Sequence, residues 1–411
     1  MKRQGLLLLL LCISPWCYAQ QGELPYKDQI LVDHLKTVQL QSNDKEQTLP
    51  VITLGGTSSL QFSFDDLQGG SKRYRYSILH CSADWLPSNL SPLDFTSGFA
   101  DDLIDDYRYA SGTLQKYTHY KLTLPNERVK MKIPGNYILT IYDDAAPTKA
   151  LITQRFYVSS NQVQVIPEVK PSPNVATRST HQKIDLAIHT SQLKVQNPML
   201  DIKIRVMQNA NPLTTQVPGR PSFVSASQIA YKDITSNLFE GGNEFRRLDL
   251  RRQSNAPVSI QDENRNKPRY STQPDENGRF FIGNINGRDN DTESDYMQVD
   301  LELKSAQPQG KGTAYIVGQF NQYRLSPGEA LTYHAASSGY TSKLLLKQGV
   351  YDYQYVWKPD EKDATMTPFE GSYYETRNSY QVLVYYRKPA GRWDELVGYF
   401  NIQTDTAPAG Q

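Results

Sequence analysis

Residues Tyr74–Cys81, YRYSILHC, are the stretch that decides the fold. Successive side chains of a β-strand point to opposite faces, and this stretch alternates in that way. One face of the predicted strand carries Tyr74, Tyr76, Ile78 and His80, and the other carries Arg75, Ser77, Leu79 and Cys81. His80 and Cys81 are therefore held apart, which excludes direct activation of the thiol by its neighbour. We expect Cys81 to be a buried structural residue, and a nucleophile or metal ligand assisted by a distant histidine is the alternative.

Similar short alternating runs occur along the whole chain, and turn residues separate them. Examples are SLQFSFDDL at 59–67, YTHYKLTL at 117–124 and GNYILTIYDD at 135–144. The composition agrees, with 27 Tyr, 13 Phe, 24 Pro and 25 Gly among 411 residues. Aromatic residues favour strands, while proline and glycine favour the turns between them. The sequence therefore predicts an all-β fold of tandem immunoglobulin-like or E-set-like β-sandwich domains.

The length of the chain exceeds what one hydrophobic core usually supports, so several domains are expected. We expect a signal peptide at 1–19 and a first β-sandwich domain at 20–160. A second such domain is expected at 161–305, with a long polar loop at 252–278. A third is expected at 306–405, followed by a short tail at 406–411.

The first residues, MKRQGLLLLLLCISPWCYAQQ, have the features of a secretory signal peptide. Lys2 and Arg3 precede an apolar run, and small residues precede a predicted cleavage after Ala19. Cleavage removes Cys12 and Cys17, so Cys81 has no intramolecular disulfide partner. It also leaves 42 basic against 43 acidic side chains and changes the formal charge from +1 to −1. Such a balance gives no general attraction to nucleic acid or anionic lipid.

No apolar stretch after the signal approaches the roughly 20 residues that a membrane-spanning helix needs. We therefore expect a soluble exported protein with no direct insertion into the membrane.

One acidic segment, GRDNDTESDYMQVD at 287–300, is a weak candidate for a calcium site. Its carboxylates alternate as oxygen ligands do at the start of a calcium-binding loop, and they are Asp289, Asp291, Glu293 and Asp295. The segment lacks the glycine expected at the sixth position of such a loop and has Asp300 rather than glutamate at the twelfth. An acidic hairpin loop without metal is the alternative that we favour.

The sequence contains few signatures of a catalytic site. The sequence contains no CxxC, HExxH or G-x-S-x-G motif, and its six histidines have no close metal-binding spacing. One alternative is an exported hydrolase that uses paired carboxylates. The candidates lie in a segment that has the pattern of one helical turn, and they are Asp101, Asp102, Asp105 and Asp106. Such clusters are usually solvated, so we expect no enzymatic activity and no cofactor.

The stretches AYIVGQFNQYRL at 314–325 and LLLKQGVYDYQYVW at 344–357 resemble the glycogen- and starch-binding sandwich family. That resemblance implies a carbohydrate-binding module as an alternative function. In this chain Gln322 and Tyr323 occupy the place where that family has tryptophan. Four aromatic residues alternate on one predicted strand face: Tyr351, Tyr353, Tyr355 and Trp357. Such a face is more typical of a core than of a sugar platform.

A second resemblance covers nearly the whole mature chain. The segments FSFDDL, YRYSILHCSADWLPSNLSPLDFTSGF, YTHYKLTLPN, GNYILTIYDD, GGNEFRRLDL and QGVYDYQYVW occur in an order that resembles the plug proteins of the bacterial type IX secretion system. The resemblance implies a periplasmic protein of Bacteroidota at the inner face of the outer membrane. Its implied partner is the translocon barrel of the SprA type, also called Sov, whose pore the plug closes when no cargo is bound. It implies no small-molecule substrate and no nucleic acid.

For such an interface the sequence offers five candidates from aromatic and arginine-containing segments: Trp85, Phe95, Phe99, Phe245 and Arg246. Aromatic and arginine side chains often dominate the binding energy of protein interfaces. Any of the five is also a candidate for the core. The polar loop 252–278 has no match in the family pattern.

Overall fold

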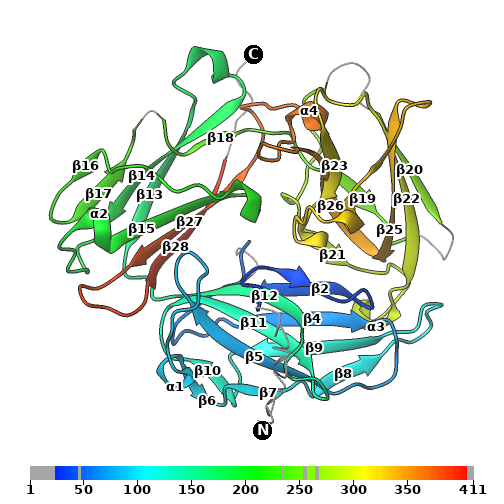
Figure 1. The fold of residues 1–411 in the computed structure, drawn as a ribbon, viewed down its shortest axis with the longest axis horizontal. Helices are drawn as coiled ribbons and strands as arrows, with labels where there is room; N and C mark the ends of the chain where they lie inside the picture. The colour runs from blue at the N-terminus through cyan, green and yellow to red at the C-terminus, as the bar shows by residue number, and fades with distance from the viewer. Residues whose placement is uncertain (1–23, 45–47, 234, 253–256, 264–267, 405–411) are drawn as a thin grey trace, which may run out of the picture.

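The computed structural model describes residues 24–44, 48–233, 235–252, 257–263 and 268–404. The predicted signal peptide with Cys12 and Cys17, the tail 406–411 and parts of the 252–278 loop lie outside the described residues. The described chain is almost entirely β-structure, and it forms three lobes that meet around a common centre (Figure 1). The predicted all-β fold of packed sheets is therefore confirmed.

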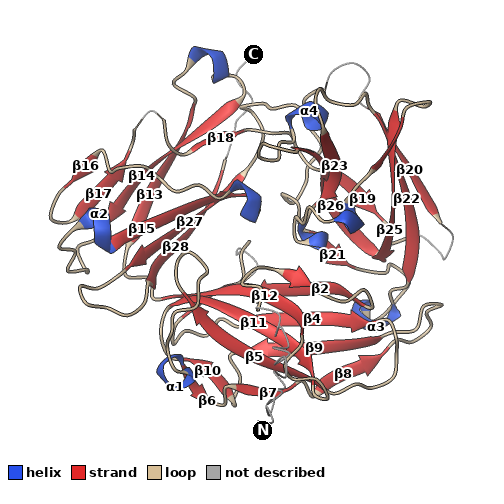
Figure 2. Cartoon of the chain, viewed as in Figure 1, coloured by secondary structure: helices blue, strands red, loops and turns tan. Residues whose placement is uncertain are grey.

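The helices of the described residues are short and lie between strands (Figure 2). The α-helices are α1 (Pro92–Phe95), α2 (Pro198–Asp201), α3 (Asn290–Glu293) and α4 (Thr367–Glu370), and the 3-10 helices are η1 (Val175–Thr177), η2 (Pro212–Thr214), η3 (Gln319–Asn321) and η4 (Pro327–Glu329). In the part of the chain that the structure describes, no helix has the length and apolar character needed to cross a bilayer.

Lobe 1 comprises the described residues of 24–160 and packs two sheets face to face. The larger sheet has the order β1-β12-β11-β5-β7, with β3 beside β12. Its strands are β1 (Gln29–Ile30), β3 (Val51–Thr53), β5 (Tyr74–Cys81), β7 (Asp101–Leu103), β11 (Gly135–Asp143) and β12 (Ala150–Ser159). The second sheet contains, in order, β2 (Leu35–Ser42), β4 (Leu60–Asp66), β9 (Thr118–Leu124) and β8 (Asp106–Tyr109). A separate pair is formed by β6 (Thr96–Gly98) and β10 (Val129–Met131).

Lobe 2 joins two distant parts of the chain, the described residues of 161–240 and residues 379–404. One sheet has the order β13-β14-β17-β16, with β18 beside β14. Its strands are β13 (Gln164–Pro171), β14 (His181–His189), β16 (Phe223–Val224), β17 (Gln228–Tyr231) and β18 (Leu238–Glu240). The facing sheet contains, in order, β15 (Ile202–Gln208), β27 (Ser379–Tyr386) and β28 (Glu395–Gln403).

Lobe 3 comprises the described residues of 246–370 and also has two sheets. The first contains β19 (Arg246–Asp249), β21 (Phe280–Ile282), β23 (Gly312–Val317) and β26 (Gly349–Pro359), with β26 paired to the other three. The second contains, in order, β20 (Val258–Glu263), β22 (Tyr296–Lys304), β25 (Gly339–Lys347) and β24 (Thr332–His334). The strand β20, from the long polar loop, lies parallel to β22 at the end of this sheet.

The lobes do not follow the three consecutive segments that the sequence led us to expect. The expected boundary between residues 305 and 306 falls inside lobe 3. The hairpin β27–β28, expected in the third segment, pairs with β15 and belongs to lobe 2. Lobe 3 is thus inserted between β18 and β27, and Figure 1 shows the red C-terminal strands among the green ones. Alternation of side chains predicts where strands lie, but it contains no information on which distant strand each one pairs with.

The cores explain why these residues form these strands. In β5, Tyr74, Tyr76 and Ile78 are each 1% exposed and pack in the lobe 1 core, as the alternation predicted. The four aromatic residues of β26 also lie inside, in the core of lobe 3: Tyr351, Tyr353, Tyr355 and Trp357. Burial of such large apolar surfaces is the main driving force for the packing of each sandwich. A sugar platform on this face is excluded by the burial of these rings.

Candidate interface residues and the junctions between lobes

Two of the five predicted interface residues lie in one exposed segment of lobe 1, and they have different environments. Phe95, in α1, is 1% exposed, and its ring packs edge-on against Tyr137 with centroids 6.1 Å apart. Phe99, just after β6, is 63% exposed. Phe95 therefore anchors the segment to the core, while Phe99 projects from it.

Trp85 is partly buried, and its ring packs toward lobe 2. Its ring packs edge-on against Tyr157 at 5.3 Å, and the guanidinium of Arg155 lies 4.3 Å from its centroid. Trp85 packs against a hydrophobic cluster that contains Met207 and Leu383 of lobe 2. Trp85 thus contributes to the junction between lobes 1 and 2.

The last two candidates, Phe245 and Arg246, lie at the start of lobe 3. Phe245 is 4% exposed and packs with Tyr323 and its neighbours in a small cluster. Arg246 donates to Glu370 at 3.0 Å and lies 3.4 Å from Asp262. Its carboxylate partners raise the pKa of Arg246 against the effect of burial, so the side chain is charged and used internally.

Arg246 lines a polar cleft of about 590 Å³ in lobe 3. The walls of the cleft come from β19, from β20 and from residues 269–273 of the long polar loop. Arg246 pairs with both Asp262 and Glu370 across it. The charged groups of the cleft therefore hold the end strands of the two sheets together.

The four carboxylates of the predicted calcium segment bind groups of the protein itself. Asp289 and Asp291 both bind the guanidinium of Arg108 on β8, with Asp291 at 2.9 Å. Asp295 accepts the backbone N–H of Leu114 at 2.7 Å and also that of Gln115. Glu293 accepts the backbone N–H of Arg288. Among the described residues, no three carboxylate, histidine or cysteine side chains gather as a metal-binding group. The segment joins lobe 1 to lobe 3.

Three of the four carboxylates of the hydrolase alternative lie on strands, and Asp105 lies between them. The expected helical turn does not form: Asp101 and Asp102 belong to β7, and Asp106 begins β8. Asp101 binds Arg75 at 2.9 Å, whereas Asp102 and Asp105 lie 3.1 and 3.7 Å from Arg128. Each of these three carboxylates thus faces an arginine. This is an arrangement typical of a charged surface.

His80 and Cys81 are both buried at the end of β5. Burial raises the pKa of the Cys81 thiol to about 12, so the thiol is protonated at neutral pH. Burial also lowers the pKa of His80 to about 4, so the imidazole is neutral. A protonated thiol beside a neutral imidazole has no nucleophilic activation.

The junction between lobes 1 and 3 is built on a buried carboxylate that sequence reasoning did not single out. Asp65 of β4 accepts from the Lys347 ammonium at 2.7 Å and from the Tyr296 hydroxyl at 2.6 Å, and lies 2.7 Å from Nδ1 of His119. Burial lowers the pKa of Lys347, and Asp65 opposes that shift. The signal in the sequence was a charged side chain at the end of an apolar alternating run, in FSFDDL and again in LLLK.

A second buried carboxylate, Asp394, serves the junction between lobes 1 and 2. It accepts from Arg387 at 2.8 Å and from Lys203 at 3.3 Å within lobe 2. It also accepts the backbone N–H of Ala83 in lobe 1 at 3.0 Å. Beside it, Asp84 of lobe 1 forms an ion pair with Arg205 of lobe 2. The loop that carries Trp85 is therefore fixed to lobe 2 by both charge and packing.

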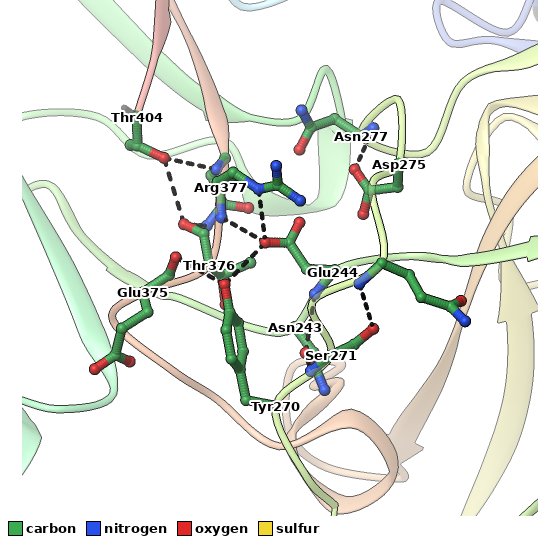
Figure 3. A network of polar contacts seen from close by, with 12 residues as sticks. Asn243, Glu244, Tyr270, Ser271, Asp275, Asn277, Glu375, Thr376, Arg377 and Thr404 are labelled. Carbon is green, nitrogen blue, oxygen red and sulfur yellow. Dashed lines mark hydrogen bonds and ion pairs between the residues drawn. The ribbon is translucent and has the colours of Figure 1, made fainter. Parts of the chain in front are cut away.

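Lobes 2 and 3 are joined by two linkers, residues 241–245 and 371–378, which Figure 3 shows close together. Glu244 of the first linker accepts from the backbone and the guanidinium of Arg377 in the second, at 3.1 and 3.2 Å. The amide of Asn243 donates to Glu370 O at 2.9 Å. Each of the three pairs of lobes is thus held by buried polar side chains.

Comparison with known proteins places these features in a family. Residues 35–160 match the model of the type 9 secretion system plug protein 1st domain. The crystal structure of a hypothetical protein from Parabacteroides merdae ATCC 43184 is 31% identical, with a TM-score of 0.88, and the alignment covers 93% of this chain and 100% of that chain. The crystal structure of collagen adhesin from S. aureus aligns over 90% of this chain and 92% of its own at 8% identity, with a TM-score of 0.13. No curated protein matches the chain significantly.

Proposed function

Because the chain belongs to the type 9 secretion system plug family, we propose that it binds the periplasmic side of the outer-membrane translocon barrel of the SprA or Sov type and closes its pore when no cargo is bound. The family is not a family of enzymes, and its members act in secretion. The plug closes the pore as a rigid body, without cofactor or chemistry. A wide barrel leaves an aqueous lumen, which a bulky body must block.

The observation that carries this proposal is the set of buried charged contacts that joins the three lobes. A plug that resists leakage must keep its shape, and flexible segments lose entropy when they are ordered at an interface. In this chain the fully buried pair of Asp65 and Lys347 joins lobe 1 to lobe 3, and Asp394 helps to join lobe 1 to lobe 2. Separating the lobes would leave these charges unpaired, at a cost of several kcal/mol.

We infer that the docking surface includes the exposed segment 86–99 of lobe 1. Three of its large apolar side chains are exposed by 63 to 76%: Leu86, Leu93 and Phe99. The segment is braced from behind by Phe95 in the core and by an ion pair of Asp94 with Arg392 at 3.4 Å. Apolar side chains held in place in advance are suited to binding a partner, because little freedom is lost.

The experiment is affinity purification of the tagged protein from native membranes, followed by conductance of the purified translocon in a planar bilayer. We expect a very large barrel protein to co-purify, and the current to rise when the plug is stripped away and to fall when it is added back. Failure of any barrel to co-purify, or a current indifferent to the plug, would contradict the proposal.

Two surface variants test the docking segment in the same assay. Phe99→Asp should reduce co-purification at least about tenfold, because a charge then replaces an apolar anchor. Val175→Asp, on the 88% exposed Val175 of lobe 2, is the matched control and should co-purify normally. Equal recovery of the two variants would exclude segment 86–99 as the docking surface.

A further inference from the structure

The inserted lobe 3 is covalently connected to lobe 2 through the two linkers, which pack directly against each other. The hydroxyls of Thr365 and Thr367 in lobe 3 also donate to Glu240 of lobe 2, at 3.1 and 2.9 Å. The backbone N–H of Tyr373 donates to Gly242 O at 2.9 Å, and the Thr376 hydroxyl donates to the same oxygen at 2.8 Å. A Cβ atom at Gly241 would lie 1.9 Å from Tyr373 O, so only glycine permits this approach. Gly242 and Gly371 have φ values of +66° and +78°. Such a pair of glycine-containing crossings is a natural place for two lobes to rotate.

A third segment, residues 268–279 at the end of the long polar loop and just after it, lies across both linkers. Its backbone is held by the side chain of Asn243, which donates to Arg269 O and accepts from the N–H of Ser271, each at 2.9 Å. The second linker holds it through the Tyr373 hydroxyl, which donates to Pro268 O at 2.6 Å. The segment is therefore bound to each linker separately.

Tyr270 lies at the point where the segment touches both linkers (Figure 3). Its hydroxyl is 3.1 Å from Oε1 of Glu244 and 3.1 Å from the backbone oxygen of Glu375, so it can donate to either. Its ring packs against Tyr373 with centroids 5.5 Å apart. Loss of this one hydroxyl would remove the side-chain contact through which the segment touches both linkers at one point.

The other end of the segment is attached to lobe 3. Asp275 accepts the backbone N–H of Phe245, and it also accepts the N–H of Asn277 at 3.0 Å. The carboxylate of Asp352 on β26 accepts the N–H of Glu276. None of residues 268–279 belongs to a core cluster. Polar contacts of this kind can open without exposing an apolar core to water.

We propose that residues 268–279 form a latch, which ties the two linkers to lobe 3 and whose release loosens the junction between lobe 2 and lobe 3. The latch is a property of the isolated chain and does not depend on the translocon. Release of the latch loosens this one junction and leaves the buried contacts of both lobes with lobe 1 in place.

The charges around Asp275 make the latch sensitive to pH. Four charged groups face it: Glu244 and Arg377 from the linkers, Arg247 from β19 and Asp352 from β26. The arginines already pair with Glu244 and Asp352, and the neutral hydroxyl of Tyr323 lies nearby. Burial raises the pKa of Asp275 to about 7, and the two acidic neighbours add to this. The latch is thus favoured below about pH 7, where Asp275 is protonated, and loosens as the pH rises through that value.

The experiment measures the distance between lobes 2 and 3 in the full mature chain. Spin labels are placed on Ser191→Cys and Ser337→Cys, both at exposed positions, while buried Cys81 stays unlabelled. Pulsed electron paramagnetic resonance then gives the distance distribution at pH 6 and pH 8.5. We expect a narrow distribution at pH 6 and a broad one at pH 8.5. Tyr270→Phe should be broad at both pH values, and Asp275→Asn narrow at both.

The matched controls are Tyr333→Phe and Asp363→Asn in lobe 3, which should behave as the parent protein. Hydrogen exchange of the parent protein, corrected for the intrinsic effect of pH, gives an independent measurement. The amides of Phe245 and Ser271 should exchange about tenfold faster at pH 8.5 than at pH 6. A distance distribution unchanged by pH and by Tyr270→Phe, with unchanged exchange at these amides, would overturn the latch. Broadening by Tyr270→Phe without any effect of pH would overturn the role of Asp275.

Discussion

Asp65 of β4 and Lys347 of β25 are 282 positions apart in the sequence, and their carboxylate and ammonium groups lie 2.7 Å apart. The side chains are 0% and 1% exposed, so the pair is removed from water. A pair of this kind contributes little net stability when it is intact, because both charges are desolvated. Breaking it by removing one partner leaves a buried charge, which is costly. Lobes 1 and 3 are therefore held in one relative position by a contact that does not tolerate the loss of one partner alone.

The first prediction concerns that contact. Lys347→Met keeps the length of the side chain and removes its charge, so the Asp65 carboxylate remains buried without its ammonium partner. We expect the free energy of unfolding to fall by about 3–5 kcal/mol. Urea denaturation, followed by circular dichroism and by tryptophan fluorescence, measures the change.

Lys343→Met is the matched control for this variant, because Lys343 is an exposed residue of the same strand. Its effect should lie within about 0.5 kcal/mol, as for most surface substitutions. Equal stability of the two variants would show that the buried pair does not hold the lobes.

Local features of this fold were predictable from sequence because they depend on neighbouring residues. The alternation of Tyr74–Cys81 predicted a strand with Tyr74, Tyr76 and Ile78 inside, and β5 has that arrangement. The order of the family segments predicted the plug family, which the domain match confirms.

The remaining features depend on contacts between distant residues, and the sequence alone does not contain them in a readable form. Nothing in the run of β27 indicates that it pairs with β15, about 180 residues earlier, in addition to its neighbour β28. The roles of Trp85 and Phe245 depend on which lobe covers them. Both were candidates for an external interface; in the structure Trp85 packs, partly buried, against a cluster shared with lobe 2, and Phe245 is buried in a small cluster of lobe 3. An aromatic residue in a loop looks the same in sequence whether a second lobe or solvent lies above it.

The second prediction separates the two phenylalanines of segment 86–99. Phe95→Ala removes a ring that is 1% exposed and should cost about 3–5 kcal/mol of stability, because it leaves a cavity in the lobe 1 core. Phe99→Ala removes a ring that is 63% exposed and should change stability by less than about 0.5 kcal/mol. Urea denaturation of both variants tests the difference. A large loss of stability in Phe99→Ala would mean that this ring is needed by the fold and is not free for a partner.

The third prediction concerns the thiol of Cys81. Because the side chain is buried and burial raises its pKa to about 12, the folded protein should not react with Ellman's reagent at pH 8. In urea the mature protein should release one equivalent of the coloured product per chain, and Cys81→Ser should release none. Two or three equivalents from the secreted protein would show that Cys12 or Cys17 is retained. Rapid reaction of the folded protein would show that the end of β5 opens to solvent.

The last prediction concerns acid stability and rests on His80. The ring is 3% exposed and packs edge-on against Tyr137 at 5.0 Å, and burial lowers its pKa from 6.5 to about 4. The unfolded chain therefore binds a proton that the folded chain does not bind between pH 6.5 and about 4. The stabilising contribution of neutral His80 is complete above pH 6.5 and is lost as the pH falls through that range. We expect this one group to account for about 2–3 kcal/mol of the loss.

The variant His80→Gln tests this contribution because glutamine does not titrate. Urea denaturation at intervals from pH 7.5 to pH 4 should show a smaller slope of stability against pH for the variant than for the parent protein. Other groups titrate equally in both proteins, so the difference between the two slopes belongs to His80. His334→Gln, at an exposed position of lobe 3, should leave the slope unchanged. If His80→Gln and the parent protein lose stability in parallel, the imidazole of His80 is already charged in the folded state, and the packing at the end of β5 must then include a counter-charge.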